Sequence, residues 1–167
     1  MKRIALLPAF ILIFLTAFAG CSEKSDPLFY EKKNTVAEIV ISLNETEVSA
    51  KLSLSEPKEN GERDAELVFL YPETVAGLTV RRLNGKAEAS INGDAIGDGV
   101  YCEGFLCVAE FFSTDGSPDS VKTENGNTIL TVTSKTGKYC ILLGKDGYPK
   151  RITKDKMTVD VVWIETK

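Results

Sequence analysis

A strict alternation of apolar and polar side chains runs through Val48-Ser49-Ala50-Lys51-Leu52-Ser53-Leu54-Ser55. Successive side chains of a β-strand point to opposite faces, so this pattern predicts a strand with one apolar and one polar face. Strands of this kind form antiparallel sheets that cover a core on one side only. The stretch therefore predicts an antiparallel sheet with a single buried face.

Two further stretches, 35–43 and 157–164, repeat the alternation near the two ends of the predicted domain. By contrast, 67–71 is apolar on both faces, which indicates a central strand with another element packed over it. The residues expected to share the apolar faces of the two alternating stretches are Ala37, Ile39, Ile41 and Leu43, and Met157, Val159, Val161 and Trp163.

Turn sequences separate the strand candidates. Asn-Gly pairs such as 84–85 and Asp-Gly pairs such as 146–147 tolerate the positive φ that tight hairpins require. Short runs rich in β-branched and aromatic residues lie between these pairs. The acid- and glycine-rich stretch 92–99 lacks the spacing of a calcium loop, so we expect a solvated turn there. The further strands expected are 79–83, 87–91, 128–134, 138–143 and 150–154.

One stretch departs from the hairpin pattern. Leu106, Ala109 and Phe112 recur at helical spacing and lack turn residues between them, so we expect a short helix over 105–113. A strand over 105–112 is the alternative, and a second helical turn is expected at 73–76. The fold class is then mainly β (α+β), because a sheet with one dry face must bury that face. We expect an antiparallel sheet of about nine to eleven strands, with one or two short helices packed on its dry face.

Residues 1–20 are typical of an export signal. Lys2 and Arg3 precede an apolar run that is too short to span a membrane as a helix. The following Phe18-Ala19-Gly20-Cys21 resembles the lipobox of bacterial lipoproteins. That resemblance implies that Cys21 receives a diacylglyceryl group, and two acyl chains suffice for a stable anchor. An ordinary signal, cleaved near Ala17 or Ala19, is the alternative.

The sequence then divides into a lipid-anchored flexible tether, 21–34, and a single β-rich domain, 35–167. The net charge of the whole chain is −4 at pH 7, and it becomes more negative without Lys2 and Arg3. An acidic domain of this kind lacks the basic patch that nucleic-acid binding requires. We therefore expect a protein at the extracytoplasmic face of the cell membrane, held there by its lipid.

The chain contains no histidine, which removes the commonest general base and the commonest metal ligand. We expect no enzyme, no cofactor and no metal. Three cysteines follow Cys21, and Cys102 and Cys107 would form a disulfide if a tight turn brought them face to face. The alternative is that Cys102, Cys107 and Cys140 are small buried hydrophobic residues.

Two segments carry a resemblance to a known family. Tyr71-Pro72-Glu73-Thr74-Val75-Ala76-Gly77-Leu78-Thr79-Val80 and Lys145-Asp146-Gly147-Tyr148-Pro149-Lys150-Arg151-Ile152 look like a strand–turn element and a late hairpin of small Firmicutes-type lipoproteins. The fold of these lipoproteins is similar to the half-barrel of the periplasmic lipoprotein carrier. The resemblance implies a curved sheet around a hydrophobic cavity, with short helices as a lid.

The function expected from this resemblance is a carrier or binding module for an acyl or lipid-like ligand. The alternative for the same inward side chains is that they fill the core themselves. A second function class is an envelope accessory lipoprotein that binds a protein partner through a sheet edge or an aromatic patch. The residues expected to line the cavity are Leu52, Leu54, Val68, Leu70, Ile91, Phe111, Phe112, Leu130 and Leu142.

Overall fold

The computed structural model describes residues 26–114, 118–134 and 136–167 of the 167-residue chain. The predicted signal, Cys21 and the beginning of the predicted tether lie outside the described residues. Among the described residues, no helix has the length and apolarity to cross a bilayer.

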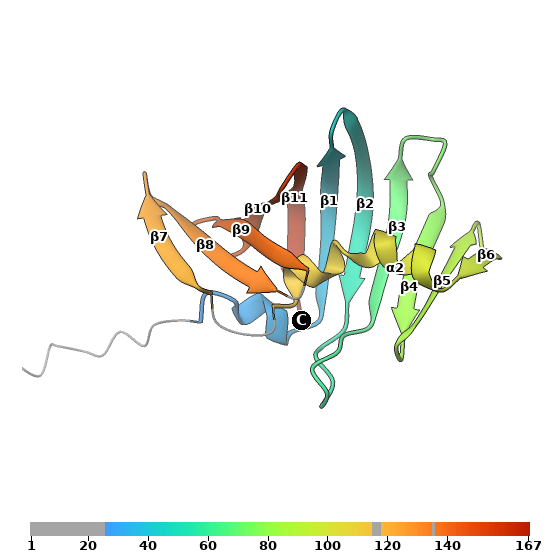
Figure 1. Ribbon diagram of the computed structural model, residues 1–167, viewed down its shortest axis with the longest axis horizontal. Coiled ribbons are helices and arrows are strands. Elements are labelled where there is room, and N and C mark those ends of the chain that lie inside the picture. Colours follow the sequence, from blue (N-terminus) through green and yellow to red (C-terminus); the bar gives the residue numbers. More distant parts are fainter. Residues whose placement is uncertain (1–25, 115–117, 135) are drawn as a thin grey trace, which may run out of the picture.

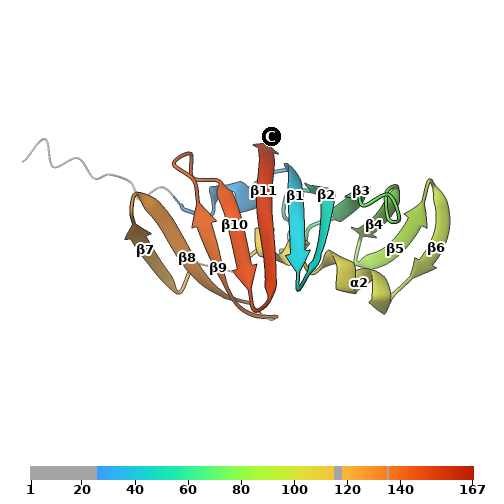
Figure 2. The ribbon, with the colours of Figure 1, turned by 90° about the horizontal axis from the view of Figure 1, so that it is seen from above.

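One antiparallel sheet of eleven strands makes up most of the molecule (Figure 1). Its spatial order is β6-β5-β4-β3-β2-β1-β11-β10-β9-β8-β7, so β1 and β11 pair and join two hairpin-built halves at the centre. The large antiparallel sheet is as predicted, and Figure 2 shows that it is bent from one edge to the other. The strands are β1 (Thr35–Leu43), β2 (Thr46–Leu54), β3 (Ala65–Tyr71), β4 (Leu78–Leu83), β5 (Lys86–Ile91), β6 (Asp94–Asp98), β7 (Ser120–Glu124), β8 (Asn127–Ser134), β9 (Gly137–Leu143), β10 (Pro149–Lys154) and β11 (Met157–Thr166).

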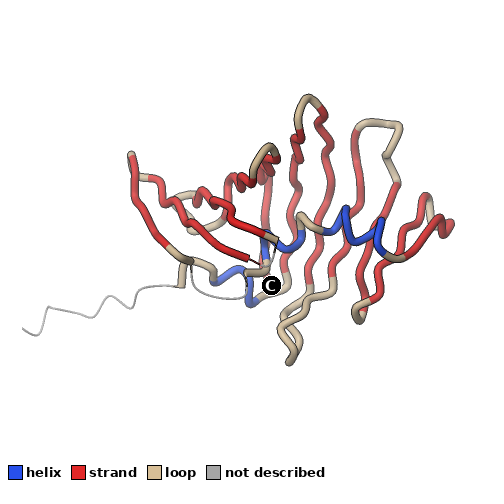
Figure 3. Tube along the Cα trace, viewed as in Figure 1, coloured by secondary structure: helices blue, strands red, loops and turns tan. Residues whose placement is uncertain are grey.

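Helical segments lie against one face of the sheet (Figure 3). The α-helix α2 (Val100–Leu106) is followed by the 3-10 helix η2 (Ala109–Phe112), and we call these two segments together the cover. The single helix predicted over 105–113 is confirmed only in part, because α2 begins five residues earlier and ends at Leu106, and a separate 3-10 helix covers Ala109–Phe112. The stretch 73–76 forms turns, in which the Ala76 amide donates to the Pro72 carbonyl at 3.1 Å.

We call the sheet face under the cover the inner face. In β2, Ala50 and Leu52 are completely buried there, while Lys51 between them is exposed. The alternation that predicted this strand is therefore confirmed from Ala50 to Leu54. Leu67 of β3 and Val80 of β4 extend the same buried layer.

A β-bulge changes the orientation of the C-terminal strand. Glu38 pairs with Trp163 and Ile39 pairs with Val161, so Val162 is the extra residue of β11. Val162 and Trp163 are consequently 61% and 48% exposed, and Trp163 faces outward with Glu38. The prediction that Trp163 shares the buried face was wrong, because a bulge shifts the two-residue period by one.

The two edge strands were not expected from the sequence. Asp94–Asp98 pairs with β5, although 92–99 as a whole was expected to be a turn. Its five residues are all exposed, so no apolar alternation marks them. Ser120–Glu124 forms the other edge, and four of its five residues are exposed. Edge strands that bury no face are invisible to a pattern based on hydrophobicity.

The domain also starts earlier than the sequence suggested. The 3-10 helix η1 (Phe29–Lys32) packs onto the sheet within the stretch assigned to the tether. Leu28 is 3% exposed and Tyr30 is completely buried. The Phe29 ring contacts the Tyr148 ring, with 5.0 Å between centroids. Three consecutive large side chains therefore bind this segment to the domain.

Candidate functional site

The centre of the inner face is packed solid. Leu52 and Leu67 of the sheet and Leu106 of the cover are each exposed by 1% or less. Phe111 and Phe112 extend the same contact toward β8 and β9, where the Phe111 and Tyr139 rings lie 5.1 Å apart. There is no room for a ligand here, because these side chains fill the space between sheet and cover themselves.

An apolar groove of about 590 Å³ lies beside this core, at the end of the sheet where the β1–β2 hairpin turns. Phe69 and Leu78 contribute from the sheet, and Gly104, Phe105 and Cys107 from the cover. No charged side chain lines it among the described residues. The remaining lining residues are Ile41, Leu43, Asn44, Thr46, Val48, Val75, Val108 and Met157.

An aromatic pair stands over the groove. Phe105 of α2 is 49% exposed, and its ring meets the Phe69 ring edge-on with 5.8 Å between centroids. Cys107 lies one residue beyond α2, and burial raises the pKa of its thiol. The groove therefore offers hydrocarbon and aromatic surface and a thiol that stays protonated at neutral pH. Among its described lining residues, none is arranged for acid–base or nucleophilic chemistry.

The residues expected to line a cavity fall into three groups. Leu52, Leu54, Leu130, Phe111 and Phe112 are buried in the packed core, and of these Leu54 also borders the polar pocket described below. That these five residues bind a ligand stays a prediction. The groove is lined instead by the beginning of β2, through Thr46 and Val48.

The other four residues expected to line the cavity differ in the face of the sheet on which their side chains lie. Val68, Leu70 and Leu142 alternate with the buried Leu67, Phe69, Ile141 and Leu143, so they lie on the outer face, and Leu70 is 46% exposed. The prediction that these three side chains point inward was wrong. Both stretches are apolar on both faces, so the hydrophobic period could not indicate which face is buried. Ile91 pairs with Leu78, a groove residue, and therefore lies on the inner face at the groove's edge.

The predicted disulfide is not formed. Cys102, Cys107 and Cys140 are free thiols. Cys102 is buried within α2, and Cys107 follows its end, so a helix replaces the tight turn that a bridge would need. Cys140 is exposed on β9, unlike the other two.

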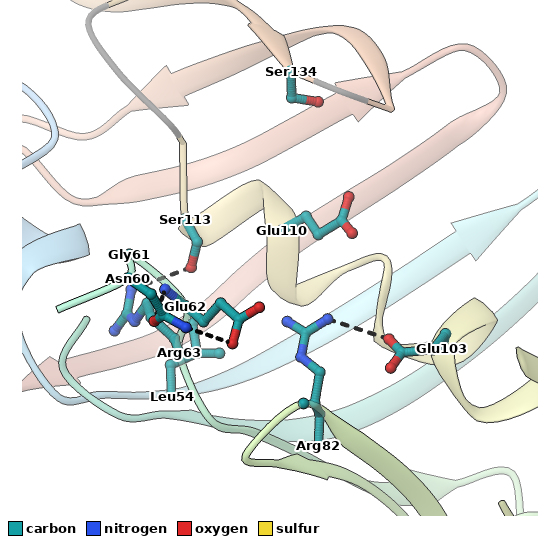
Figure 4. A pocket seen from close by; sticks show the side chains of 11 residues that line it. Leu54, Asn60, Gly61, Glu62, Arg63, Arg82, Glu103, Glu110, Ser113 and Ser134 are labelled. Atoms are coloured by element: carbon teal, nitrogen blue, oxygen red, sulfur yellow. Dashed lines mark hydrogen bonds and ion pairs between the residues drawn. The ribbon is translucent and has the colours of Figure 1, made fainter. Parts of the chain in front are cut away.

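A second, polar pocket of about 410 Å³ lies on the opposite side of the cover (Figure 4). Arg82 of β4 donates to Glu103 of α2 at 3.2 Å across it. Glu62, Glu110 and Arg63 also line the pocket, so three carboxylates face two guanidinium groups there. The Arg82–Glu103 pair fastens the cover to the sheet on the side away from the groove.

Arg63 is the least exposed cation among the described residues, at 4%. Its guanidinium donates to three backbone carbonyls from three segments: Ser55 at 2.5 Å, Phe112 at 2.8 Å and Lys33 at 2.5 Å. Burial lowers its pKa, although the nearby Glu31 acts in the opposite direction. Arg63 thus ties the end of the cover to the end of η1 and to the exit of β2.

Glu31 of η1 is buried beside this cluster and is 8% exposed. Its Oε2 accepts hydrogen bonds from the Thr114 amide at 2.9 Å and the Thr114 hydroxyl at 2.6 Å. Burial raises the pKa of Glu31 to about 7 against these hydrogen bonds and the Arg63 charge. Sequence reasoning missed both Glu31 and Arg63, because each stands among other charged residues with no pattern that marks burial.

Comparison with known proteins gives a fold likeness and no family. No family model and no curated protein matches the chain. An uncharacterised conserved protein from Thermus thermophilus has a similar structure, with a TM-score of 0.53 and 12% identity over 85% of this chain and 84% of that one. At that identity the likeness shows the fold alone.

Two further solved structures are similar at lower scores. MucB in its Pseudomonas aeruginosa complex with MucA has a TM-score of 0.45 and 15% identity, and the match covers 84% of this chain but only 54% of that one. A LolA superfamily protein from Nitrosomonas europaea has a TM-score of 0.41 and 8% identity over 87% and 91% of the two chains. These likenesses are too distant to support a conclusion about function.

Proposed function

We propose that this protein is a lipid-anchored, extracytoplasmic binding or carrier module for a hydrophobic ligand, with no catalytic activity. The observation that supports it is the apolar groove between the cover and the β1–β2 end of the sheet. Its volume of about 590 Å³ lies in the usual range of small-molecule sites. An acyl chain or a similarly slender apolar molecule suits a groove whose polar lining is confined to Asn44 and Thr46.

The expected affinity is modest. Burying about ten methylene groups contributes roughly 8 kcal/mol. Association costs at least about 4 kcal/mol in lost translational and rotational freedom. The remaining roughly 4 kcal/mol corresponds to a Kd of about 1 mM for one chain, and tighter binding needs more buried surface. A weakly held, releasable ligand is appropriate for transport rather than storage.

Gly104 offers a clean test of the groove. It lines the groove, and a Cβ at this position meets no heavy atom within 4 Å. The Gly104→Leu side chain occupies groove volume, while losing a helix-interior glycine favours α2 by about 0.5–1 kcal/mol. We expect a fluorescent acyl probe to bind the wild type and to bind Gly104→Leu at least about tenfold more weakly, a loss of about 1.4 kcal/mol.

Gly97→Leu is the matched control. Gly97 lies in β6, and its Cβ would also meet no heavy atom within 4 Å. This variant adds the same side chain away from the groove and should bind the probe like the wild type. Equal binding by both variants, or no binding by the wild type, would contradict the proposal.

The anchor is tested separately. Cells that express the full chain should incorporate radiolabelled palmitate into it, and Cys21→Ser should abolish the incorporation. Mass spectrometry of the purified protein should show a diacylglyceryl group on Cys21. An unlabelled wild-type chain would remove the anchor from the proposal and leave the groove untouched.

A second candidate function rests on the bulge in β11. Val162 and Trp163 form an exposed apolar pair on the outer face, and exposed tryptophan is frequent where proteins contact a partner. An envelope accessory protein would use this surface. Crosslinking from membranes should then recover a partner with the wild type and lose it with Trp163→Ser, while acyl-probe binding stays unchanged.

A further inference from the structure

The end of the cover is fastened twice. The Phe112 carbonyl accepts from Arg63, and two residues later Thr114 donates both its amide and its hydroxyl to Glu31. Glu31 cannot easily follow Thr114 if the contact opens, because Leu28 and Tyr30 hold η1 in the core. An opening of this contact therefore moves Ser113 and Thr114, which follow η2.

The Glu31 carboxylate is only half satisfied. Oε2 accepts both hydrogen bonds from Thr114, whereas Oε1 is buried and has no hydrogen-bond partner among the described residues. A buried carboxylate without a full set of partners strongly disfavours its ionised form. The neutral acid keeps Oε2 as an acceptor for Thr114 and avoids the cost of a buried charge.

The surrounding charges partly offset one another. Arg63, from the segment before β3, favours the ionised form of Glu31, and Asp26 disfavours it. Lys32 belongs to the same 3-10 helix but is occupied by Asp26 in a 2.6 Å ion pair. The Tyr30 hydroxyl lies nearby, is buried and has no hydrogen-bond partner in the part of the chain that the structure describes. The burial of the Glu31 carboxylate away from water therefore decides that its neutral form is preferred.

We propose that Glu31 is a proton-controlled catch on the end of the cover. The neutral side chain holds Thr114 against η1, and ionisation favours opening of this contact so that water reaches the carboxylate. Arg63 remains protonated throughout and continues to hold Phe112. The catch therefore adjusts, in response to pH, how firmly Ser113 and Thr114 are held against η1 at the end of the cover. It requires no ligand and stands independently of the groove's proposed function.

Proton linkage gives the direction and the size of the pH effect on the opening of this contact. Burial raises the pKa of Glu31 from 4.5 to about 7. A group that binds its proton more tightly in the closed state favours closure below pH 4.5 and loses that advantage as the pH rises to 7. If the open state is fully solvated, the opening constant rises by at most about 300-fold across this interval.

The Thr114 amide reports the catch directly, because it donates to Glu31 Oε2. Its hydrogen exchange is measured by NMR on the full chain between about pH 5 and 8 and corrected for the intrinsic pH dependence. Protection of Thr114 should fall with pH in the wild type and stay constant in Glu31→Gln, whose amide oxygen still accepts. The Gly77 amide, bonded to the Phe69 carbonyl at 3.0 Å, serves as an internal reference.

Glu45→Gln, at the exposed β1–β2 turn, is the matched control and should behave like the wild type. A carboxyl carbon titration of wild-type Glu31 provides a second readout that needs no variant, and its midpoint should lie near 7. The same pH profile in Glu31→Gln and wild type, rising Thr114 protection with pH, or a Glu31 midpoint near 4.5 would each overturn the proposal.

Discussion

Replacing Arg63 with methionine should destabilise the protein by about 3 kcal/mol. Methionine keeps an unbranched apolar stem of similar length but removes every donor. The carbonyls of Ser55, Phe112 and Lys33 then lose their partner. An unsatisfied buried acceptor costs about 1–3 kcal/mol, and we take the lower end because two of these bonds are only partly buried. Relief of the buried guanidinium's own desolvation opposes the loss of the carbonyl partners.

Glu31 adds to the cost. It loses the positive charge that favours its ionised form, so the pKa of Glu31 should rise further in the variant. Because Arg63 joins three segments, the loss should appear as a cooperative effect on the whole domain.

Urea denaturation followed by far-UV circular dichroism measures this change. Arg63→Met should lower the midpoint with an unchanged slope, since a constant slope indicates a similar change in exposed surface. Arg151→Met is the matched control, because Arg151 is 56% exposed and its pair with Asp160 lies at the surface. A loss below about 1 kcal/mol in Arg63→Met, or equal losses in both variants, would refute the reasoning.

Three further predictions follow from named contacts. The wild type should lose about 3 kcal/mol of stability between pH 4.5 and 7, because the raised pKa of Glu31 makes its neutral form the stabilising one. Glu31→Gln should abolish this loss, and urea titration at each pH measures it. Leu52→Ala should cost about 2–5 kcal/mol, since Leu52 is completely buried between sheet and cover, and a loss near zero would mean that the inner face is not packed. A thiol reagent should modify the exposed Cys140 first and the buried Cys102 only on unfolding. Cys107 should react slowly, because burial raises the pKa of its thiol. A bound acyl probe should protect Cys107 alone, because only this cysteine lines the groove.

The sheet could be predicted wherever one face of a strand is buried. Ala50, Leu52 and Leu54 alternate with polar residues, and the structure buries all three. The same reasoning failed at Trp163, because one extra residue in β11 reverses the faces beyond it. It could not find β6, whose five exposed residues carry no apolar period.

The candidate site was less accessible to sequence reasoning. Core and groove residues have the same chemistry, so composition cannot separate Leu52, which packs, from Leu78, which lines open space. Arg63 and Glu31 are 32 residues apart in the chain and meet only because η1 and the β2–β3 connection converge at the end of the cover. A single sequence carries no signal for such long-range polar contacts.

The cover owes its helical form to its contacts with the sheet. The helix α2 has only seven residues, contains Gly104, and has no side-chain hydrogen bond at its N-cap Gly99. An isolated helix of that length is unstable in water, so α2 persists because residues such as Cys102 and Leu106 are buried against the sheet. Segments held mainly by tertiary contacts open at lower free energy than core strands. Arg63, Arg82 and Glu31 fasten the cover at the side and end away from the groove. The groove side, where Phe105 is half exposed, is therefore where the cover can yield to a ligand without breaking the packed centre.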